Sequence, residues 1–300
     1  MTCPPDSRLW GRHGGRHTTF TECGPCFPPA GLPQASSKAY SGDLERGWTL
    51  TTLEHAKTLL AKALRNTPLR LGYHWAKSRL SFGSSQSDEA RIVRELAFSE
   101  DAPKTFVEFG FHPTEFNCIG LPPDFEGVLI DGDASTVRLA KLILPDRLKA
   151  IHKFLTLENI GIVRDCFPQL GVLSIDVNGN DYWLLKSLIA SSPAVISVEY
   201  NASLGNEPIT MPYIEDFNRF TAHDSNWYHG ASLSALAKLC ANNGYGLAAV
   251  SAGGMNAFFT RSGSLDASTE WRPHESRCRL SGTSTSEQWA TIGHLPFVRV

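Results

Sequence analysis

Short apolar runs alternate with helical patterns through the central part of the chain. The first five runs have the length of strands and are bounded by polar or turn residues; they are TFVEFG (105–110), GVLIDGD (127–133), a short run at 153–156, GVLSIDV (171–177) and AVISVEY (194–200). Between or after them, apolar residues recur at helical spacing, as at 182–189 and 232–242. Repeated strand–helix units with continuously apolar strands predict a parallel sheet with helices on both faces.

The last two predicted strands are joined by a short turn and not by a helix. GLAAVS (246–251) and NAFFTR (256–261) are joined by only four residues. A parallel crossover needs a dozen or more residues, so these two strands must form an antiparallel hairpin. The predicted fold class is therefore α/β, a Rossmann-like sheet that is mostly parallel, with an antiparallel hairpin strand at one edge.

The pattern also divides the chain into four parts. Residues 1–45 are rich in Pro, Gly, Ser and Thr without a sustained period, and we interpret them as a flexible N-terminal arm. Residues 46–100 carry two helical patterns, the second at 88–98, and are predicted to be a helical cover. Residues 101–262 form the predicted sheet domain, and residues 263–300 a C-terminal extension packed on it.

Composition and charge narrow the class of protein. With 300 residues, 42% hydrophobic and 19% charged, the chain has the make-up of a globular enzyme with one large domain. A formal charge of −2 without a long basic run disfavours nucleic acid and acidic membrane surfaces as partners. No secretory signal and no apolar stretch long enough to span a bilayer is visible, so we expect a cytoplasmic location without membrane attachment.

Four of the predicted strands end in an acidic residue. These residues are Glu108, Asp131, Asp176 and Glu199. In doubly wound sheets, ligands bind beyond the carboxyl ends of the strands, where the strand order reverses. Capping of the following helices is the alternative explanation, and Asp133 and Asp181 are suited to it. Because four strand ends share the feature, we favour a cofactor crevice.

The first two strand ends have the features of a nucleoside site. Gly110 allows the backbone to approach a ligand, and a helix after it would offer amide groups to a ligand carboxylate beside Glu108. His112 lies in the same loop. Asp131 stands where nucleotide-binding folds place the acid that binds ribose hydroxyls, with Asp133 as the fallback. So many carboxylates disfavour a pyrophosphate, and no GxGxxG follows the first strand, so S-adenosylmethionine is favoured over NAD.

One block of the sequence resembles a known family. SIDVNGNDYWLLKSL (174–188) is similar to the block after the fourth strand in FkbM-type methyltransferases, and VEFG, LIDGD, FLTLENI (154–160) and SVEYN follow the order of that family. The likeness covers about residues 104–261. It implies a class I methyltransferase fold, S-adenosylmethionine as the cofactor, and often O-methylation in natural-product or glycan pathways. It also implies cofactor-side roles for Glu108, Gly110, Asp131 and Asp176.

The chain departs from the family pattern in two places. The first loop, GFHPTEFN (110–117), has Phe111, His112 and Pro113 where a further glycine is usual, and Asn178 replaces an acid. These departures keep a second function class open, a non-catalytic or regulatory protein that retains the methyltransferase fold.

The acceptor side is predicted from the later strand ends. Asp176, Asn180, Asp181, Glu199 and Asn201 are expected to face one cleft. Asp176, Glu199 and His229 are the candidate catalytic residues, His229 as a base because the ordinary pKa of histidine lies near neutrality. A structural hydrogen-bonding role is the alternative for His229. The predicted reaction is methyl transfer to a hydroxyl or amine of a small molecule.

Metal binding is the less favoured variant of this site. The oxygens of Asp176, Asn180, Asp181 and Glu199 suit Mg²⁺, but we predict a site without a metal ion. In the N-terminal arm, His13, His17, Cys23 and Cys26 have zinc-like spacing, which we attribute to chance in a segment of biased composition.

Overall fold

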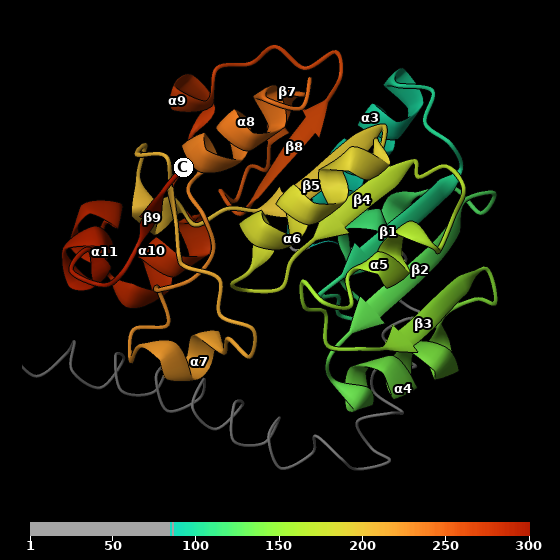
Figure 1. Ribbon diagram of the computed structural model, residues 1–300, viewed down its shortest axis with the longest axis horizontal. Helices are drawn as coiled ribbons and strands as arrows, with labels where there is room; N and C mark the ends of the chain where they lie inside the picture. The colour runs from blue at the N-terminus through green and yellow to red at the C-terminus, as the bar shows by residue number, and fades with distance from the viewer. Residues whose placement is uncertain (1–84, 86) are drawn as a thin grey trace, which may run out of the picture. The chain divides into compact units, whose positions relative to one another are not determined.

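The computed structural model describes residue 85 and residues 87–300 (Figure 1). The chain divides into two compact units, Met1–Lys57 and Thr58–Val300, and every described residue belongs to the second. The helix predicted after residue 51 and the His/Cys group at 13–26 lie outside the described residues. So does the whole of the predicted flexible arm.

A seven-stranded sheet organises the described residues. Its strands run in the order β3-β2-β1-β4-β5-β8-β7, with bounds β1 Thr105–Phe109, β2 Glu126–Asp131, β3 Leu148–His152, β4 Val172–Ile175, β5 Val195–Glu199, β7 Gly246–Val250 and β8 Asn256–Thr260. The first five strands pair in parallel, and β8 is antiparallel to both β5 and β7. The predicted Rossmann-like sheet with an antiparallel hairpin strand is confirmed.

Helices cover both faces of this sheet (Figure 1). Phe106 and Val107 are neighbours in β1 and belong to different core clusters, as the alternation of side chains along a strand requires. The cluster around Phe106 includes residues of α3 (Glu89–Ser99) and α4 (Ala134–Ile143). The cluster around Val107 includes residues of α5 (Gly161–Arg164), α6 (Asp181–Leu188) and α8 (Leu233–Ala241). The helix predicted at 88–98 is thus confirmed as α3, and it packs on the sheet.

The strand predicted at 153–156 is wrong. The third strand, β3, ends at His152, before that segment begins. As an edge strand it is only partly buried, and Lys149 and His152 dilute its apolar pattern. Phe154 and Leu155 are apolar like strand residues, but they follow β3 and line a cleft.

The helix predicted after the first strand is also absent. Between β1 and β2 the chain forms only a short 3₁₀ helix, η1 (Asn117–Gly120). Prolines at 113, 122 and 123 leave little room for an α-helix, because proline lacks the amide hydrogen and clashes with the preceding turn. Phe111 and Phe116 are instead buried in the core cluster that contains Phe106, and α3 packs against η1.

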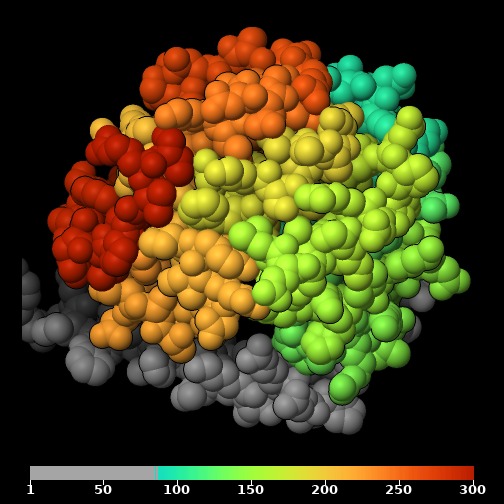
Figure 2. All heavy atoms as spheres, viewed as in Figure 1, coloured from blue at the N-terminus to red at the C-terminus, as the bar shows by residue number. Residues whose placement is uncertain are grey.

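The C-terminal residues pack on the segment that follows β5. That segment contains η3 (Ala202–Leu204), β6 (Ile209–Thr210) and α7 (Arg219–Ala222). The C-terminal part contains α9 (Ala267–Glu270), α10 (Glu275–Ser281), α11 (Thr285–Ile292) and β9 (Val298–Arg299), which pairs with β6. Figure 2 shows these red and orange residues in contact beside the sheet. Among the described residues, no helix combines the length and apolar composition that a membrane span requires.

Candidate functional site

A cleft of about 600 Å³ opens at the carboxyl ends of the parallel strands. Its lining includes all four acidic strand ends, namely Glu108, Asp131, Asp176 and Glu199. The strand order reverses between β1 and β4, because β2 and β3 extend to one side and β5 to the other. This is the switch point at which doubly wound sheets bind ligands. The predicted crevice therefore exists, and the remaining predicted cofactor residues, Gly110, His112 and Asp133, also line it.

Gly110 lets β1 and β4 approach each other at the floor of the cleft. Its φ is +79°, a left-handed conformation that glycine adopts without strain. A Cβ at this position would lie 1.4 Å from the carbonyl oxygen of Asp176. The Gly110 amide donates to the carbonyl of Ile130 on the other side, at 3.1 Å. Backbone packing, besides access for a ligand, requires glycine here.

Glu108 shapes the loop between β1 and η1. Its two carboxylate oxygens accept the backbone amides of Asn117 and Cys118, at 2.7 and 2.8 Å. Burial raises the pKa of Glu108, and these two hydrogen bonds oppose the rise. The amides that the sequence led us to expect for a ligand carboxylate are thus engaged by Glu108 itself. Beside them, His112 and Glu115 pair as a tight turn in the loop.

Asp131 and Asp133 have different surroundings after β2. Asp133 is the N-cap of α4, accepting the amide of Ser135 at 2.9 Å, as the capping alternative predicted. Asp131 accepts the Asp133 amide at 2.6 Å and keeps its half-buried carboxylate on the cleft. Burial is the main cause that raises the pKa of Asp131.

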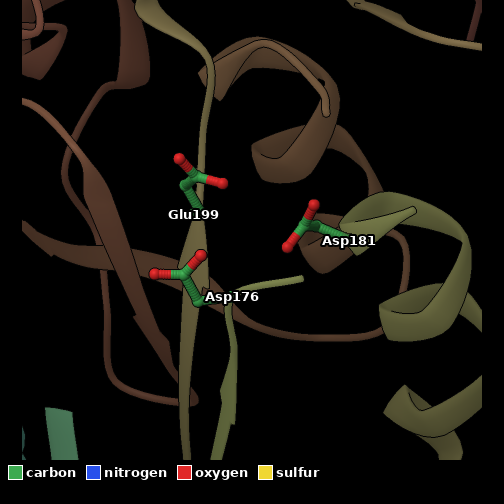
Figure 3. Close-up of side chains that lie close together, drawn as sticks. All are labelled: Asp176, Asp181 and Glu199. Carbon is green, nitrogen blue, oxygen red and sulfur yellow. The ribbon is translucent and has the colours of Figure 1, made fainter. Parts of the chain in front are cut away.

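Three carboxyl groups lie together at the ends of β4 and β5 and at the start of α6. Asp176, Asp181 and Glu199 each place one oxygen within 4.8 Å of the others, and Figure 3 shows their carboxyl groups facing a common space. Asp181 accepts the amides of Val177 at 2.9 Å and Gly179 at 2.8 Å, so it closes the loop after β4. Asp176 and Glu199 line the cleft.

Burial and mutual repulsion make this cluster retain protons. The pKa of Asp176 lies well above its ordinary value, first because of burial and then because of Glu199 and Asp181. Burial and Glu199 raise the pKa of Asp181 to about 7. Burial also raises the pKa of Glu199, against the opposing effects of Arg219, Arg277 and a hydrogen bond from Asp176. These shifts favour protonated carboxyl groups in the cluster near neutral pH.

The cluster does not require a metal ion to balance its charge. Both oxygens of Asp181 already accept backbone amides, and burial and repulsion raise the pKa values of Asp176 and Glu199, so protonation reduces the charge of the cluster. Arg219 adds a positive charge, with its Nη1 atom 3.7 Å from Glu199 Oε1. Mg²⁺ therefore keeps the lesser place that it has in the sequence prediction.

Arg219 is a cleft residue that the sequence did not reveal. Its guanidinium group donates to the side chain of Asn178 and, at 2.9 Å, to the carbonyl of Asn226. Asn178 has a φ of +57°, a left-handed conformation that asparagine tolerates better than most residues. Asn178 thus connects the loop after β4 to Arg219.

His229 lies behind the cleft. The imidazole ring is fully buried, and its Nδ1 atom is 3.8 Å from Glu199 Oε2. His229 is not among the residues that line the cleft, and neither is Asn201, whereas Asn180 is. Burial, Arg219 and Arg277 hold the pKa of His229 well below its ordinary value.

The C-terminal part also contributes to the cleft, which the sequence analysis missed. His274 lines it from the N-cap of α10, and burial lowers the pKa of His274 to about 4, with Arg277 and Arg219 adding to the effect. The one sequence signal is a histidine just before a short helix, which is too common to point to a site.

No protein-family model matches the chain. No curated protein matches its sequence either. Among solved structures, a putative O-methyltransferase from Klebsiella pneumoniae is 15% identical over 68% of this chain and 94% of that chain, with a TM-score of 0.41. An O-methyltransferase from Bacillus cereus in complex with SAH is 14% identical over 67% and 95%, with a TM-score of 0.41. TomG from Streptomyces achromogenes, an O-methyltransferase involved in tomaymycin synthesis and in complex with SAM, is 16% identical over 68% and 94%, also with a TM-score of 0.41. We draw no conclusion about the site from these likenesses.

Proposed function

We propose that this protein is an S-adenosylmethionine-dependent methyltransferase, similar to the FkbM type, that acts on a hydroxyl or amine of a small molecule. The observation that carries the proposal is the meeting of four acidic strand ends in one cleft at the switch point of the sheet. A cationic sulfonium and an uncharged adenine suit an acidic cleft. A pyrophosphate does not, and the β1 loop lacks the glycine-rich turn that would bind one.

Asp131 is the residue we assign to the ribose. It keeps its carboxylate on the cleft, whereas Asp133 is engaged in capping α4. Gly110 and His112 would border the methionine end. Glu108 would act there indirectly, since both its oxygens hold the loop amides.

Asp176 and Glu199 are the residues we assign to the acceptor. Methyl transfer is an in-line displacement, so the protein must align the acceptor and take its proton. A bond forms between the acceptor oxygen or nitrogen and the methyl carbon as the sulfur–carbon bond breaks, and the acceptor proton passes to the carboxylate of Glu199 or Asp176. Their place on the cleft favours these two over His229 as the base.

Calorimetry with S-adenosylhomocysteine tests the cofactor assignment. The wild-type protein should bind it, and Asp131→Ala should weaken binding about tenfold or more, because hydrogen bonds to a charged group are lost. Asp146→Ala, an exposed aspartate beyond α4, is the control and should bind like the wild type. Absence of binding by the folded wild-type protein would contradict the proposal.

The non-catalytic alternative needs a separate measurement. It is favoured by the first loop, because Phe111, His112, Glu115 and Phe116 all line the cleft there and the further glycine usual in methyltransferases is missing. Incubation with methyl-labelled S-adenosylmethionine and a metabolite extract distinguishes the two. Label recovered in a small molecule, and absent with boiled protein, supports transfer, whereas cofactor binding without transfer supports the alternative.

A further inference from the structure

A row of buried polar side chains connects the C-terminal helices to the cleft. It runs from α11 to the end of β5 and comprises Gln288, Ser203, Arg277, His229 and Glu199. None of these residues is more than 8% exposed. Polar groups are costly to bury unless each has a partner in the right protonation state, so the row constrains the protonation of its members.

Arg277 is the centre of this row. Its Nη1 atom donates to Asn201 Oδ1 at 2.7 Å and to Ser203 Oγ at 2.9 Å, and Ser203 in turn donates to Gln288 at 2.6 Å. Burial and Arg219 lower the pKa of Arg277 to about 10, so it remains charged at neutral pH. Its Nη2 atom lies 3.0 Å from Nε2 of His229.

This last contact determines where His229 carries its proton. A guanidinium group has only donors, so Nε2 of His229 must be the acceptor. A neutral imidazole that accepts at Nε2 carries its hydrogen at Nδ1. In a doubly protonated ring, Nε2–H of His229 would face the N–H donors of Arg277 without an acceptor between them. The contact therefore excludes the doubly protonated form.

The Nδ1 hydrogen faces the cleft carboxylate. Nδ1 of His229 and Oε2 of Glu199 are 3.8 Å apart, and neither atom has a hydrogen-bond partner among the described residues. This separation is too long for a hydrogen bond. An unpaired buried donor and an unpaired buried acceptor that face each other gain by closing the gap, and such contacts often tighten when a ligand binds.

We propose that Arg277 fixes His229 in its Nδ1–H form and that His229 thereby orients Glu199 in the cleft. His229 and Arg277 are then positioning residues. The oxygen Oε2 faces His229 at 3.8 Å on one side, while Oε1 lies 3.7 Å from Arg219 on the other. The C-terminal helix α10 thus sets the carboxylate at the end of a strand more than seventy positions earlier in the chain.

Imidazole ¹⁵N NMR on the full-length protein without cofactor tests the first step. The His229 signals are those that disappear in His229→Asn. We expect a protonated Nδ1 and an unprotonated Nε2 in the wild type. A protonated Nε2 in the wild-type protein would overturn the proposal without recourse to any variant of Arg277.

Three variants test the role of Arg277. Arg277→Met, which removes the donors, should move the His229 proton to Nε2, the form that free imidazole side chains prefer. Arg277→Lys keeps a charged donor and should retain the Nδ1 proton. Arg279→Met changes an exposed arginine of the same helix and should leave the signals unchanged. An Arg277→Met protein that is folded and keeps the wild-type His229 signals would overturn the proposal.

Glu199→Gln tests the second step. The Nδ1–H proton resonance of His229 should shift when the charged acceptor becomes a neutral one, and Asp131→Asn, in the same cleft, should not shift it. An unchanged resonance in Glu199→Gln would show that His229 does not act on Glu199. Only one part of this inference depends on the proposed function, namely that Glu199 acts on a methyl acceptor. Because the spectra need no cofactor, a failure to bind S-adenosylhomocysteine would leave it standing.

Discussion

Two separate reasons favour glycine at position 110, one from the cleft and one from the sheet. The sequence suggests that glycine admits a ligand, and the structure adds a backbone reason, the carbonyl of Asp176 at 1.4 Å from any Cβ. Gly110→Ala should therefore lower the free energy of unfolding by at least about 2 kcal/mol, through strain at positive φ and displacement of β4. Denaturant titration measures it.

Gly161→Ala is the matched control for that substitution. Gly161 is a helical position in α5 with no atom within 4 Å of an added Cβ. Alanine there should stabilise the protein by about 0.5–1 kcal/mol or leave it unchanged. Equal losses from both alanines would contradict the assigned reason.

The acidic cluster should make stability fall as pH rises above 6.5. The folded pKa of Asp181, about 7, exceeds its ordinary value of 3.8, so between these values the folded state binds the proton more strongly. Raising pH through 7 therefore lowers the free energy of unfolding, and the raised pKa values of Asp176 and Glu199 act in the same direction. The carboxyl groups should contribute a loss of about 1 kcal/mol between pH 6.5 and 8.

The buried histidines act in the opposite direction in the lower part of that window. His229 and His274 have lowered pKa values and are neutral at pH 6.5 in the folded state, whereas in the unfolded chain they are still half protonated at their ordinary pKa of 6.5. Glu199→Gln removes one source of repulsion and should flatten the fall, whereas Glu207→Gln, at an exposed ion pair, should not. Because both histidines are present in both proteins, the difference between the wild-type and Glu199→Gln profiles reports on the cluster, and parallel profiles would contradict the prediction.

The four acidic strand ends were predictable, but their charged partners were not. Parallel strands bring their carboxyl ends to one edge, so the acids could be grouped from the strand pattern alone. Arg219, His274 and Arg277 follow the last parallel strand, in segments whose place depends on long-range packing. No local period marks them. His229 was selected for the ordinary pKa of its residue type, and burial removes that premise.

At the scale of elements, a sustained period of apolar residues predicted the positions of helices and strands better than a few apolar residues in a row. The helices α3, α6 and α8 and the hairpin of β7 and β8 match the expected positions because each buries one face at its own period. Two predictions were wrong, the strand at 153–156 and the helix after β1. The run at 153–156 has no alternation of apolar and polar residues. The helix was expected because a helix usually follows the first strand of such a sheet, but prolines oppose it here.

The C-terminal helices are stabilised by local capping as well as by packing. Ser284 and Glu287 form a capping box at the start of α11. Ser284→Ala should lower the free energy of unfolding by about 1 kcal/mol, since the amide of Glu287 loses its acceptor. Ser286→Ala, an exposed serine in the same first turn, is the control and should change it by less than half as much. Equal effects would show that the cap does not stabilise α11.

At the scale of the whole molecule, the cleft links the sheet to the segments that follow it. Its walls come from the ends of β1, β2, β4 and β5, from the segment after β5 and from the N-cap of α10. A ligand that bridges these walls binds the folded state and not the unfolded chain. Binding must therefore raise the stability of all of them together.

This linkage gives a prediction about which cofactor the cleft takes. S-adenosylhomocysteine at about 100 times its dissociation constant should add about 2.7 kcal/mol and raise the melting temperature measurably. NAD⁺ at the same concentration should not, because its pyrophosphate would lie against the carboxylates of Asp131 and Asp176 without a phosphate-binding turn. EDTA should leave the shift intact, since the cofactor wall uses the chain's own groups. A shift with NAD⁺ alone would reverse the cofactor assignment, and a shift that EDTA abolishes would assign the acidic cluster to a metal ion.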